Sequence, residues 1–233
     1  MNIIPKVKKE LKKHIEPKYR KTSYGFFKEE INILGVRVPT ARKIGKQLYK
    51  EIAHLEKEEV FDLVEQLLKT HIYEHFIVGF EWAYKQKPNY TKRDLKIFKH
   101  WIDKYCTNWA AIDDLCTRTM KDFLLKFPNQ GKQLLKWTKS KNRWTRRAAL
   151  SSMVYPSKEK HFLNLALQLS DAVMDDKDDL VNKPQGWMLR EAHKAHPKEI
   201  EAYVLKNKNN FARVTLRYAI ERYPTPLKKK AME

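Results

Sequence analysis

Apolar side chains recur along this chain at intervals of three and four residues, a spacing that lines one face of an α-helix. Two clear stripes contain Val60, Phe61, Val64, Leu67 and Leu68, and Ile97, Phe98, Trp101, Ile102 and Tyr105. Only six glycines occur, so the chain has few of the tight turns that bound β-strands. The pattern therefore predicts an all-α protein built from amphipathic helices that pack on one another.

Proline-containing turns mark the expected helix boundaries. They lie at residues 35–39, 87–89, 127–129, 155–157, 196–197 and 223–224. Pro88, Pro128, Pro156 and Pro197 are 40, 28 and 41 residues apart, near the length of two-helix repeats of the HEAT or armadillo kind. We predict one HEAT-like helical repeat domain, an α-solenoid, over residues 1–233, with residues 224–233 as a frayed tail. A compact orthogonal helix bundle is the alternative.

The charge of the chain is strongly positive. Its 48 Lys and Arg outnumber 28 Asp and Glu by 20, which favours a polyanionic partner, nucleic acid before an anionic membrane. Residues 123–158 contain nine basic and no acidic side chains. Spacings of 4, 3, 4 and 4 residues would align five of them in one cationic stripe that can follow a phosphate backbone in a concave basic groove. These five are Lys132, Lys136, Lys139, Arg143 and Arg147.

Several classes of protein are disfavoured. Cys106 and Cys116 form neither a CxxC metal pair nor a disulfide framework, which suits a reducing cytoplasm. No signal-peptide core, membrane-spanning stretch or basic amphipathic membrane helix is evident, so we expect a cytoplasmic protein without a membrane partner. Glycine-rich nucleotide motifs are missing as well, and we expect no cofactor.

Residues 71–75 match H-x-x-E-H, in which two histidines on one helix face can ligate zinc while the glutamate polarises water. The motif comprises only His71, Glu74 and His75, and no further motif supplies a third ligand. We therefore expect these two histidines to lie on the surface or in the groove, and we expect no metal.

A more informative segment runs from Thr107 to Leu115. Asn108 suits the N-cap of a helix that would place Trp109 and Asp113, four residues apart, on the same face. A carboxylate in a basic groove repels phosphate, so it is favoured where positive charge develops beside it. The alternative is that Trp109 is a core residue and that Asp113 or Asp114 pairs with a nearby Lys or Arg.

At four places the sequence resembles the AlkD-like DNA alkylation repair glycosylases, which are built from HEAT-like repeats. These are Ile33-Leu34-Gly35-Val36 with Pro39 and Arg42, Asn108-Trp109 with Asp113, Asn142-Arg143-Trp144-Thr145-Arg146-Arg147, and Gly186-Trp187-Met188-Leu189-Arg190-Glu191. The resemblance covers most of the chain. It departs from the family at residues 182–185, where Pro184 predicts a kink or a later start of the helix that carries Trp187.

The resemblance implies specific roles. Trp109 and Trp187 would be aromatic walls against the deoxyribose of a damaged nucleotide, and Asp113 would stabilise an oxocarbenium-like transition state and orient water. Arg147 would hold the phosphate near the lesion. Our further candidates for phosphate contact are Lys136, Lys139, Arg143, Arg146 and Arg190.

We therefore expect a monomeric, monofunctional DNA glycosylase of base-excision repair. It would hydrolyse the N-glycosidic bond of cationic N3-methyladenine and N7-methylguanine in double-stranded DNA, without metal or cofactor. The alternative is a non-catalytic helical-repeat protein that binds DNA or structured RNA. Replacing Asp113 by Asn distinguishes the two, since only an enzyme would lose activity.

Overall fold

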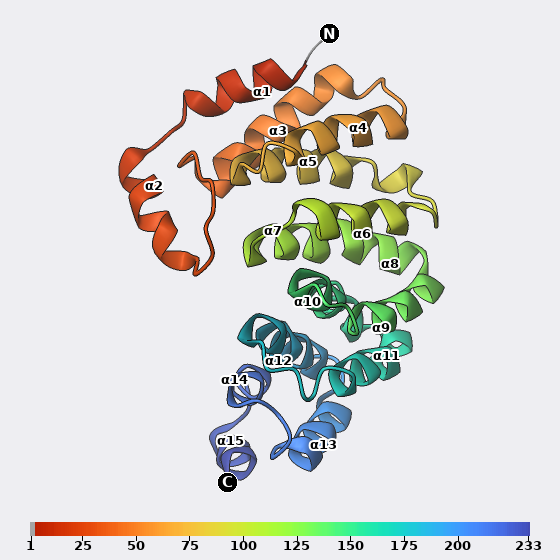
Figure 1. Ribbon diagram of the computed structural model, residues 1–233. Coiled ribbons are helices and arrows are strands. Elements are labelled where there is room, and N and C mark those ends of the chain that lie inside the picture. The colour runs from red at the N-terminus through yellow and green to blue at the C-terminus, as the bar shows by residue number, and fades with distance from the viewer. Residues whose placement is uncertain (1–2) are drawn as a thin grey trace. The chain divides into compact units, whose positions relative to one another are not determined.

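The computed structural model describes residues 3–233, which form helices and no strand (Figure 1). One isolated bridge pairs Asn32 with Ile72. The all-α prediction is confirmed. The chain, which the sequence led us to treat as one domain, divides into two compact units, Met1–Leu115 and Cys116–Glu233. Within residues 3–233, no helix combines the length and the apolar character needed to cross a bilayer.

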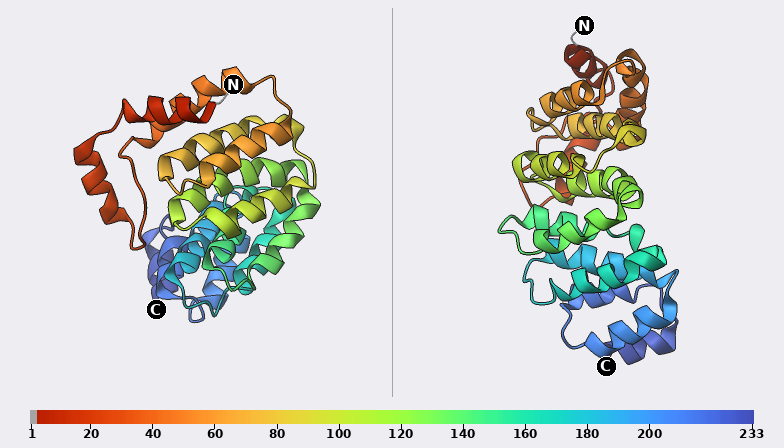
Figure 2. Two further views of the ribbon diagram at one scale, coloured as in Figure 1. Left: turned by 45° about the horizontal axis from the view of Figure 1, so that its top comes forward. Right: turned by 90° about the vertical axis from the view of Figure 1, so that its right-hand side faces the viewer.

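The N-terminal unit is a stack of antiparallel helices with an N-terminal arm (Figures 1 and 2). Its helices are α1 (Ile3–Lys12), α2 (Pro17–Ser23), α3 (Val38–Ile52), α4 (Lys57–Leu68), α5 (Tyr73–Lys85), α6 (Asp94–Tyr105) and α7 (Trp109–Asp114), with the 3-10 turns η1 (Tyr24–Phe26) and η2 (Lys87–Asn89). Helix α5 packs against both α3 and α4. All five residues of the first predicted stripe are buried in α4, and four of the second are buried in α6.

A buried carboxylate holds the loop before α3. Gly35 has a φ of +97°, a left-handed conformation that L side chains rarely adopt, and a Cβ there would lie 2.6 Å from Arg20 Cβ. The backbone N–H groups of Leu34, Gly35 and Val36 donate to the Glu74 carboxylate at 2.9, 2.7 and 3.0 Å. These bonds join the loop to the first turn of α5, so Glu74 serves as its anchor.

The C-terminal unit begins at Cys116, the second residue of the π-helical segment η3 (Leu115–Met120). Its α-helices are α8 (Lys121–Lys126), α9 (Leu134–Trp137), α10 (Arg143–Ser151), α11 (Lys160–Asp171), α12 (Asp179–His193), α13 (Pro197–Asn207), α14 (Arg213–Ala219) and α15 (Thr225–Met232). The 3-10 turns η4 (Pro128–Gln133) and η5 (Pro156–Lys158) contain two of the predicted proline boundaries. Helix α12 packs between α10 and α14.

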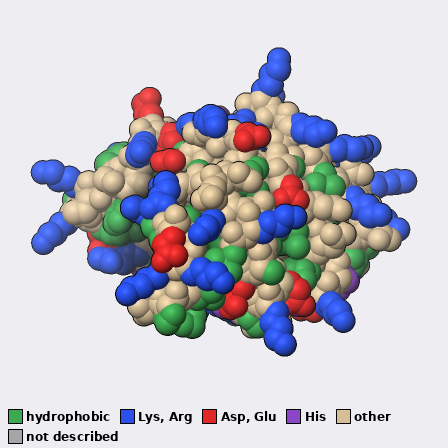
Figure 3. All heavy atoms as spheres, turned by 90° about the horizontal axis from the view of Figure 1, so that it is seen from below, with side chains coloured by type: hydrophobic (Ala, Val, Ile, Leu, Met, Phe, Trp, Pro, Cys, Tyr) green, Lys and Arg blue, Asp and Glu red, His purple; other side chains and the backbone are tan. Residues whose placement is uncertain are grey.

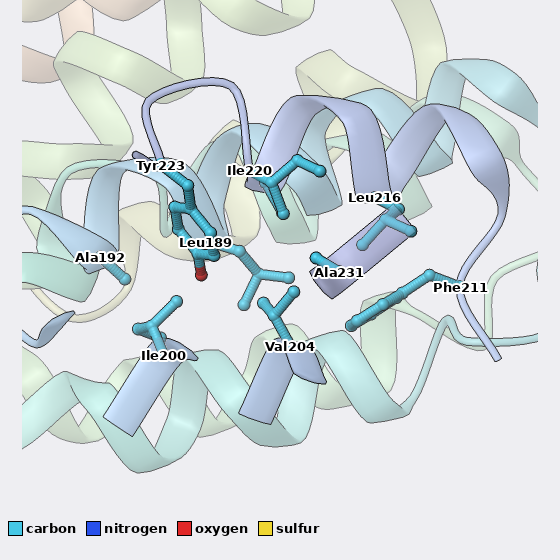
Figure 4. Close-up of a cluster of buried hydrophobic side chains, with 10 residues drawn as sticks. Leu189, Ala192, Ile200, Val204, Phe211, Leu216, Ile220, Tyr223 and Ala231 are labelled. Carbon is cyan, nitrogen blue, oxygen red and sulfur yellow. The ribbon is translucent and has the colours of Figure 1, made fainter. Parts of the chain in front are cut away.

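The end of the chain is part of a hydrophobic core. Figure 4 shows side chains from α12, α13, α14 and α15 converging on one cluster, with Leu189, Val204 and Leu216 among them. Ala231 of α15 belongs to this cluster and is 1% exposed. The prediction of a frayed tail over residues 224–233 is therefore wrong, because residues 225–232 form a helix that buries an apolar side chain.

Pro184 lies inside α12 and does not delay its start. The helix runs from Asp179 to His193, and the Asp178 side chain caps it by accepting a bond from Leu180 N at 3.0 Å. Of the two alternatives predicted from Pro184, a kink or a later start, the later start is wrong. The cap fixes the first turn upstream of the proline, so Trp187 lies in the third turn of a continuous helix.

Candidate functional site

Helix α7 places two of the predicted catalytic residues in the N-terminal unit. Asn108 is its N-cap, as predicted, and its side chain accepts a hydrogen bond from Ala111 N at 2.9 Å. Trp109 is the first residue of the helix and Asp113 lies four residues later, so the two side chains project from the same helix face. Both are half-buried.

The N-terminal arm holds the Trp109 ring. Phe27 stacks on the indole with ring centroids 5.4 Å apart and an interplanar angle of 23°, and the indole N–H donates to Phe26 O at 3.3 Å. A cavity of about 160 Å³ adjoins this pair. It is lined by Tyr19, Ser23, Phe26, Phe27, Ile33, Val36, Val38, Tyr73, Glu74, Trp109 and Ala110. The indole is thus oriented by a stacked ring and a hydrogen bond while part of its surface stays accessible.

Asp114, the carboxylate next to Asp113 in α7, is ion-paired with α3. Arg42 Nη2 lies 2.6 Å from Asp114 Oδ1, and the Asp114 side chain is only 9% exposed. This ion pair joins two of the motifs noted in the sequence, since Arg42 belongs to α3. Burial, followed by the negative charge of Asp114, raises the pKa of Tyr73, so its hydroxyl stays protonated at neutral pH. Asp114 therefore has a structural role, and Asp113 is the carboxylate that shares a face with Trp109.

The H-x-x-E-H motif has a structural role, and the prediction of two surface or groove histidines is wrong for His75, which is 1% exposed. His71 precedes the helix, at a φ of 54°, so His71 and His75 do not share a helix face. Glu74 is fully buried and accepts the three backbone bonds of the loop before α3, while His75 Nδ1 lies 2.7 Å from Thr70 Oγ1. Among residues 3–233, no three or more His, Cys, Asp or Glu side chains are grouped so that they could hold a metal ion.

The predicted cationic stripe is interrupted in the C-terminal unit. Arg143 Nε lies 2.5 Å from Asp178 Oδ2, and Arg146 Nε lies 2.6 Å from Asp176 Oδ2. Residues 123–158 contain no acid, but the loop before α12 supplies two acids across the α10–α12 packing. The prediction of one uniform cationic stripe is therefore wrong, because, of its five members, Arg143 is ion-paired and Arg147 is 5% exposed. Lys136 and Lys139 are exposed.

Arg147 lies at the buried side of α10. The residue is 5% exposed, and its Nη1 donates to the backbone carbonyl of Leu180 at 2.7 Å. Burying a guanidinium is costly unless its N–H groups are hydrogen-bonded, and carbonyl oxygens are good acceptors for them. The sequence offered no sign of this contact, because the acceptor is a backbone atom 33 residues away.

Trp187 and Arg190 extend from α12. Trp187 is half-buried and meets Tyr155 edge to face, with centroids 6.3 Å apart and planes at 81°. Arg190 Nη1 donates to Glu221, and its guanidinium carbon lies 6.0 Å from the centre of the Tyr218 ring. Trp187 is thus a partly accessible aromatic surface on a rigid helix, while Arg190 has an acidic partner.

Two features of these surroundings escaped the sequence analysis. Phe27 gave no periodic or motif signal, and only the structure shows that its ring orients Trp109. The pairing of Arg143 and Arg146 had a detectable sign, because the acid-rich run at residues 175–179 follows the acid-free segment. Basic and acidic runs close together in a helical chain can pair after folding.

Two comparisons with known proteins lead to the same family description. Residues 7–223 match the model of a family described as DNA alkylation repair enzyme. A solved structure described as a predicted DNA alkylation repair enzyme from Enterococcus faecalis matches with a TM-score of 0.78 and 17% identity, over 91% of this chain and 98% of that chain. No curated protein sequence matches this chain.

Proposed function

Because the chain belongs to the DNA alkylation repair enzyme family, we propose that it is a monofunctional DNA glycosylase that releases cationic alkylated purines. The substrates would be N3-methyladenine and N7-methylguanine in double-stranded DNA. The observation that carries the proposal is the placement of Trp109 and Asp113 on the same face of α7.

The chemistry of these substrates suits the residues of α7. A purine alkylated at N3 or N7 carries a positive charge, so it leaves as a neutral base and needs no strong general acid. As the glycosidic bond breaks, positive charge develops on the deoxyribose. A carboxylate at that point stabilises the transition state, and one well-placed electrostatic contact is typically worth about 10² to 10³ in rate.

In this proposal the residues of each unit have separate tasks. Trp109 packs against the sugar, and Asp113 stabilises the sugar cation and orients the attacking water. Within the C-terminal unit, Trp187 presents an aromatic surface to the DNA, and the exposed Lys136 and Lys139 contact phosphate. No lysine takes a nucleophilic role, so the strand stays intact after the base is released.

The decisive experiment measures release of N7-methylguanine and N3-methyladenine from methylated duplex DNA in EDTA. The Asp113→Asn variant should lose about 10² to 10³ in excision rate and retain its affinity for DNA. Asp62→Asn, the same chemical change at an exposed position of α4, is the matched control and should excise like the wild type. If the wild type and the Asp113→Asn variant both bind DNA but release no alkylpurine, the protein is a non-catalytic DNA-binding protein.

Substrate selectivity provides a second test of the same mechanism. Uracil and hypoxanthine are uncharged in DNA, so each must leave as an anion or be protonated before it leaves. They should therefore be excised far more slowly than N7-methylguanine. Uracil removal at a rate equal to that of N7-methylguanine would contradict a mechanism that depends on the charge of the leaving base.

A further inference from the structure

The carbonyl of Leu180 lacks its usual helical hydrogen-bond donor because of Pro184. In an α-helix the carbonyl of residue i accepts from the N–H of residue i+4, and Leu180 and Pro184 have this spacing in α12. Proline has no N–H, and its ring also crowds the carbonyl four residues before it. The regular bonding pattern of α12 therefore leaves the carbonyl of Leu180 without its usual donor.

Arg147 satisfies that carbonyl from the neighbouring helix. Its Nη1 donates to Leu180 O at 2.7 Å, a short bond with a charged donor. Arg147 is 5% exposed, and α10 packs against α12. The buried guanidinium of α10 thus supplies the donor that Pro184 removed from α12.

This contact lies on the side of α12 that carries Trp187. Leu180 and Trp187 are seven residues apart, close to two helical turns, so they project in nearly the same direction. Pro184 lies between them and is buried. An unsatisfied carbonyl at this point would loosen the two turns that lead into Trp187.

We propose that Arg147 is a positioning residue: its guanidinium replaces the missing N–H of Pro184 and fixes the part of α12 that orients Trp187. The resemblance to the family implied a phosphate contact for Arg147, whereas this role is directed to the protein's own backbone. The effect on catalysis rests on the proposed function, but the structural coupling between Arg147 and Pro184 does not.

A double-mutant cycle between Arg147→Met and Pro184→Ala tests the coupling. Met keeps the apolar stem and removes the donor, while Ala restores the N–H that can reach Leu180 O. In the protein that retains Pro184, Arg147→Met should raise the equilibrium constant of unfolding on the order of tenfold. In the protein that already carries Pro184→Ala, the increase should be several-fold smaller. Equal increases in both backgrounds would overturn the proposal.

A neighbouring arginine provides the matched control. Arg146 also lies on α10, but it bonds to Asp176, Ser140 O and Lys141 O and not to α12. Arg146→Met should therefore change the unfolding constant by the same factor with and without Pro184→Ala. A coupling with position 184 as large as that of Arg147 would show a general loss of stability and overturn the specific role.

Excision kinetics and DNA binding separate positioning from phosphate contact. Positioning predicts that Arg147→Met lowers the single-turnover excision rate, that Pro184→Ala restores it, and that the salt dependence of DNA binding stays unchanged. Phosphate contact predicts a salt slope reduced by about one and no rescue by Pro184→Ala, which would overturn the proposal. If the wild type releases no alkylpurine, the proposed function fails, and the unfolding cycle still decides the role of Arg147.

One measurement needs no variant and covers the case in which Arg147→Met fails to fold. In the wild-type protein, side-chain NMR should show slowly exchanging Arg147 Nη protons and a scalar coupling across the hydrogen bond to the Leu180 carbonyl carbon. Rapid exchange and free rotation of this guanidinium would overturn the proposal.

Discussion

At the scale of single residues, a motif that suggests metal chemistry is used to hold a loop and a helix start. Glu74 accepts the N–H groups of Gly35 and Val36 at 2.7 and 3.0 Å, and His75 is paired with Thr70. Glu74 and His75 therefore already have hydrogen-bond partners within the folded protein. The pattern H-x-x-E-H alone does not report this, because the partners of Glu74 are backbone groups 38 to 40 residues away.

The buried His75 makes stability depend on pH. Burial, and to a smaller extent the charge of Lys8, lowers the pKa of His75 to about 4 from about 6.5 in the unfolded chain. Between these values the unfolded chain binds a proton that the folded protein does not. The free energy of unfolding should therefore fall by about 3 kcal/mol as the pH drops from 6.5 to 4. Chemical denaturation at a series of pH values measures this.

Two variants isolate the contribution of His75. His75→Asn removes the titrating ring and should flatten the decline between pH 6.5 and 4.5, before most carboxylates titrate. His54→Asn, at an exposed position, should leave the decline as it is in the wild type. If the wild type and His75→Asn lost stability in parallel over this range, His75 would not be the cause.

At the scale of helices, the placement of Trp187 depends on close packing of α12 against α14. A Cβ on Gly186 would lie 2.4 Å from Thr215 O and 2.5 Å from Tyr218 Cβ, so only glycine allows this approach. Gln185 reinforces it, because its amide donates to Ser170 O of α11 at 3.0 Å and its carbonyl accepts from the Thr215 hydroxyl at 2.9 Å. Helices α11 and α14 thus fix the turn of α12 directly before Trp187.

Replacing Gly186 by Ala should separate α12 from α14. We expect an overpacking cost of about 1–3 kcal/mol in the free energy of unfolding, because one of the contacted atoms belongs to the backbone and cannot rotate away. Gly25→Ala is the matched control: a Cβ there meets nothing within 4 Å, so its effect should stay within about 0.5 kcal/mol. A Gly186→Ala protein as stable as the wild type would contradict the close approach.

The sequence predicted elements better than their partners. The apolar stripes of α4 and α6, the proline boundaries and the Asn108 cap are local features, and the structure confirms them. The sequence did not predict that Arg147 bonds to Leu180 O or that Ala231 is buried, because both contacts join segments that are far apart in the chain. Of the kink or later start predicted from Pro184, the later start is wrong because α12 begins at Asp179, five residues before the proline.

At the scale of the whole molecule, the net charge is +20, and ion pairs within the protein do not change this value. Figure 3 shows many Lys and Arg side chains projecting from one face, with fewer Asp and Glu among them. Arg143 and Arg146 are paired with acids of the loop before α12, which shifts the expected phosphate contacts toward Lys136 and Lys139. A protein that neutralises phosphates releases counterions from DNA, so its affinity falls steeply with salt.

The salt dependence of DNA binding therefore tests which lysines contact phosphate. If roughly six to ten phosphates are contacted, affinity should fall by about 10³ to 10⁵ between 50 and 200 mM salt. Replacing both Lys136 and Lys139 by Glu should reduce the slope of log affinity against log salt by about 2. Replacing Lys198 and Lys206 by Glu makes the same change in net charge. Both lysines lie on α13, and this variant should alter the slope much less. Equal changes in slope for the two pairs would mean that the electrostatic field of the whole protein governs binding, and not local contact by Lys136 and Lys139. An affinity that does not change between about 50 and 200 mM salt would argue against phosphate contact altogether.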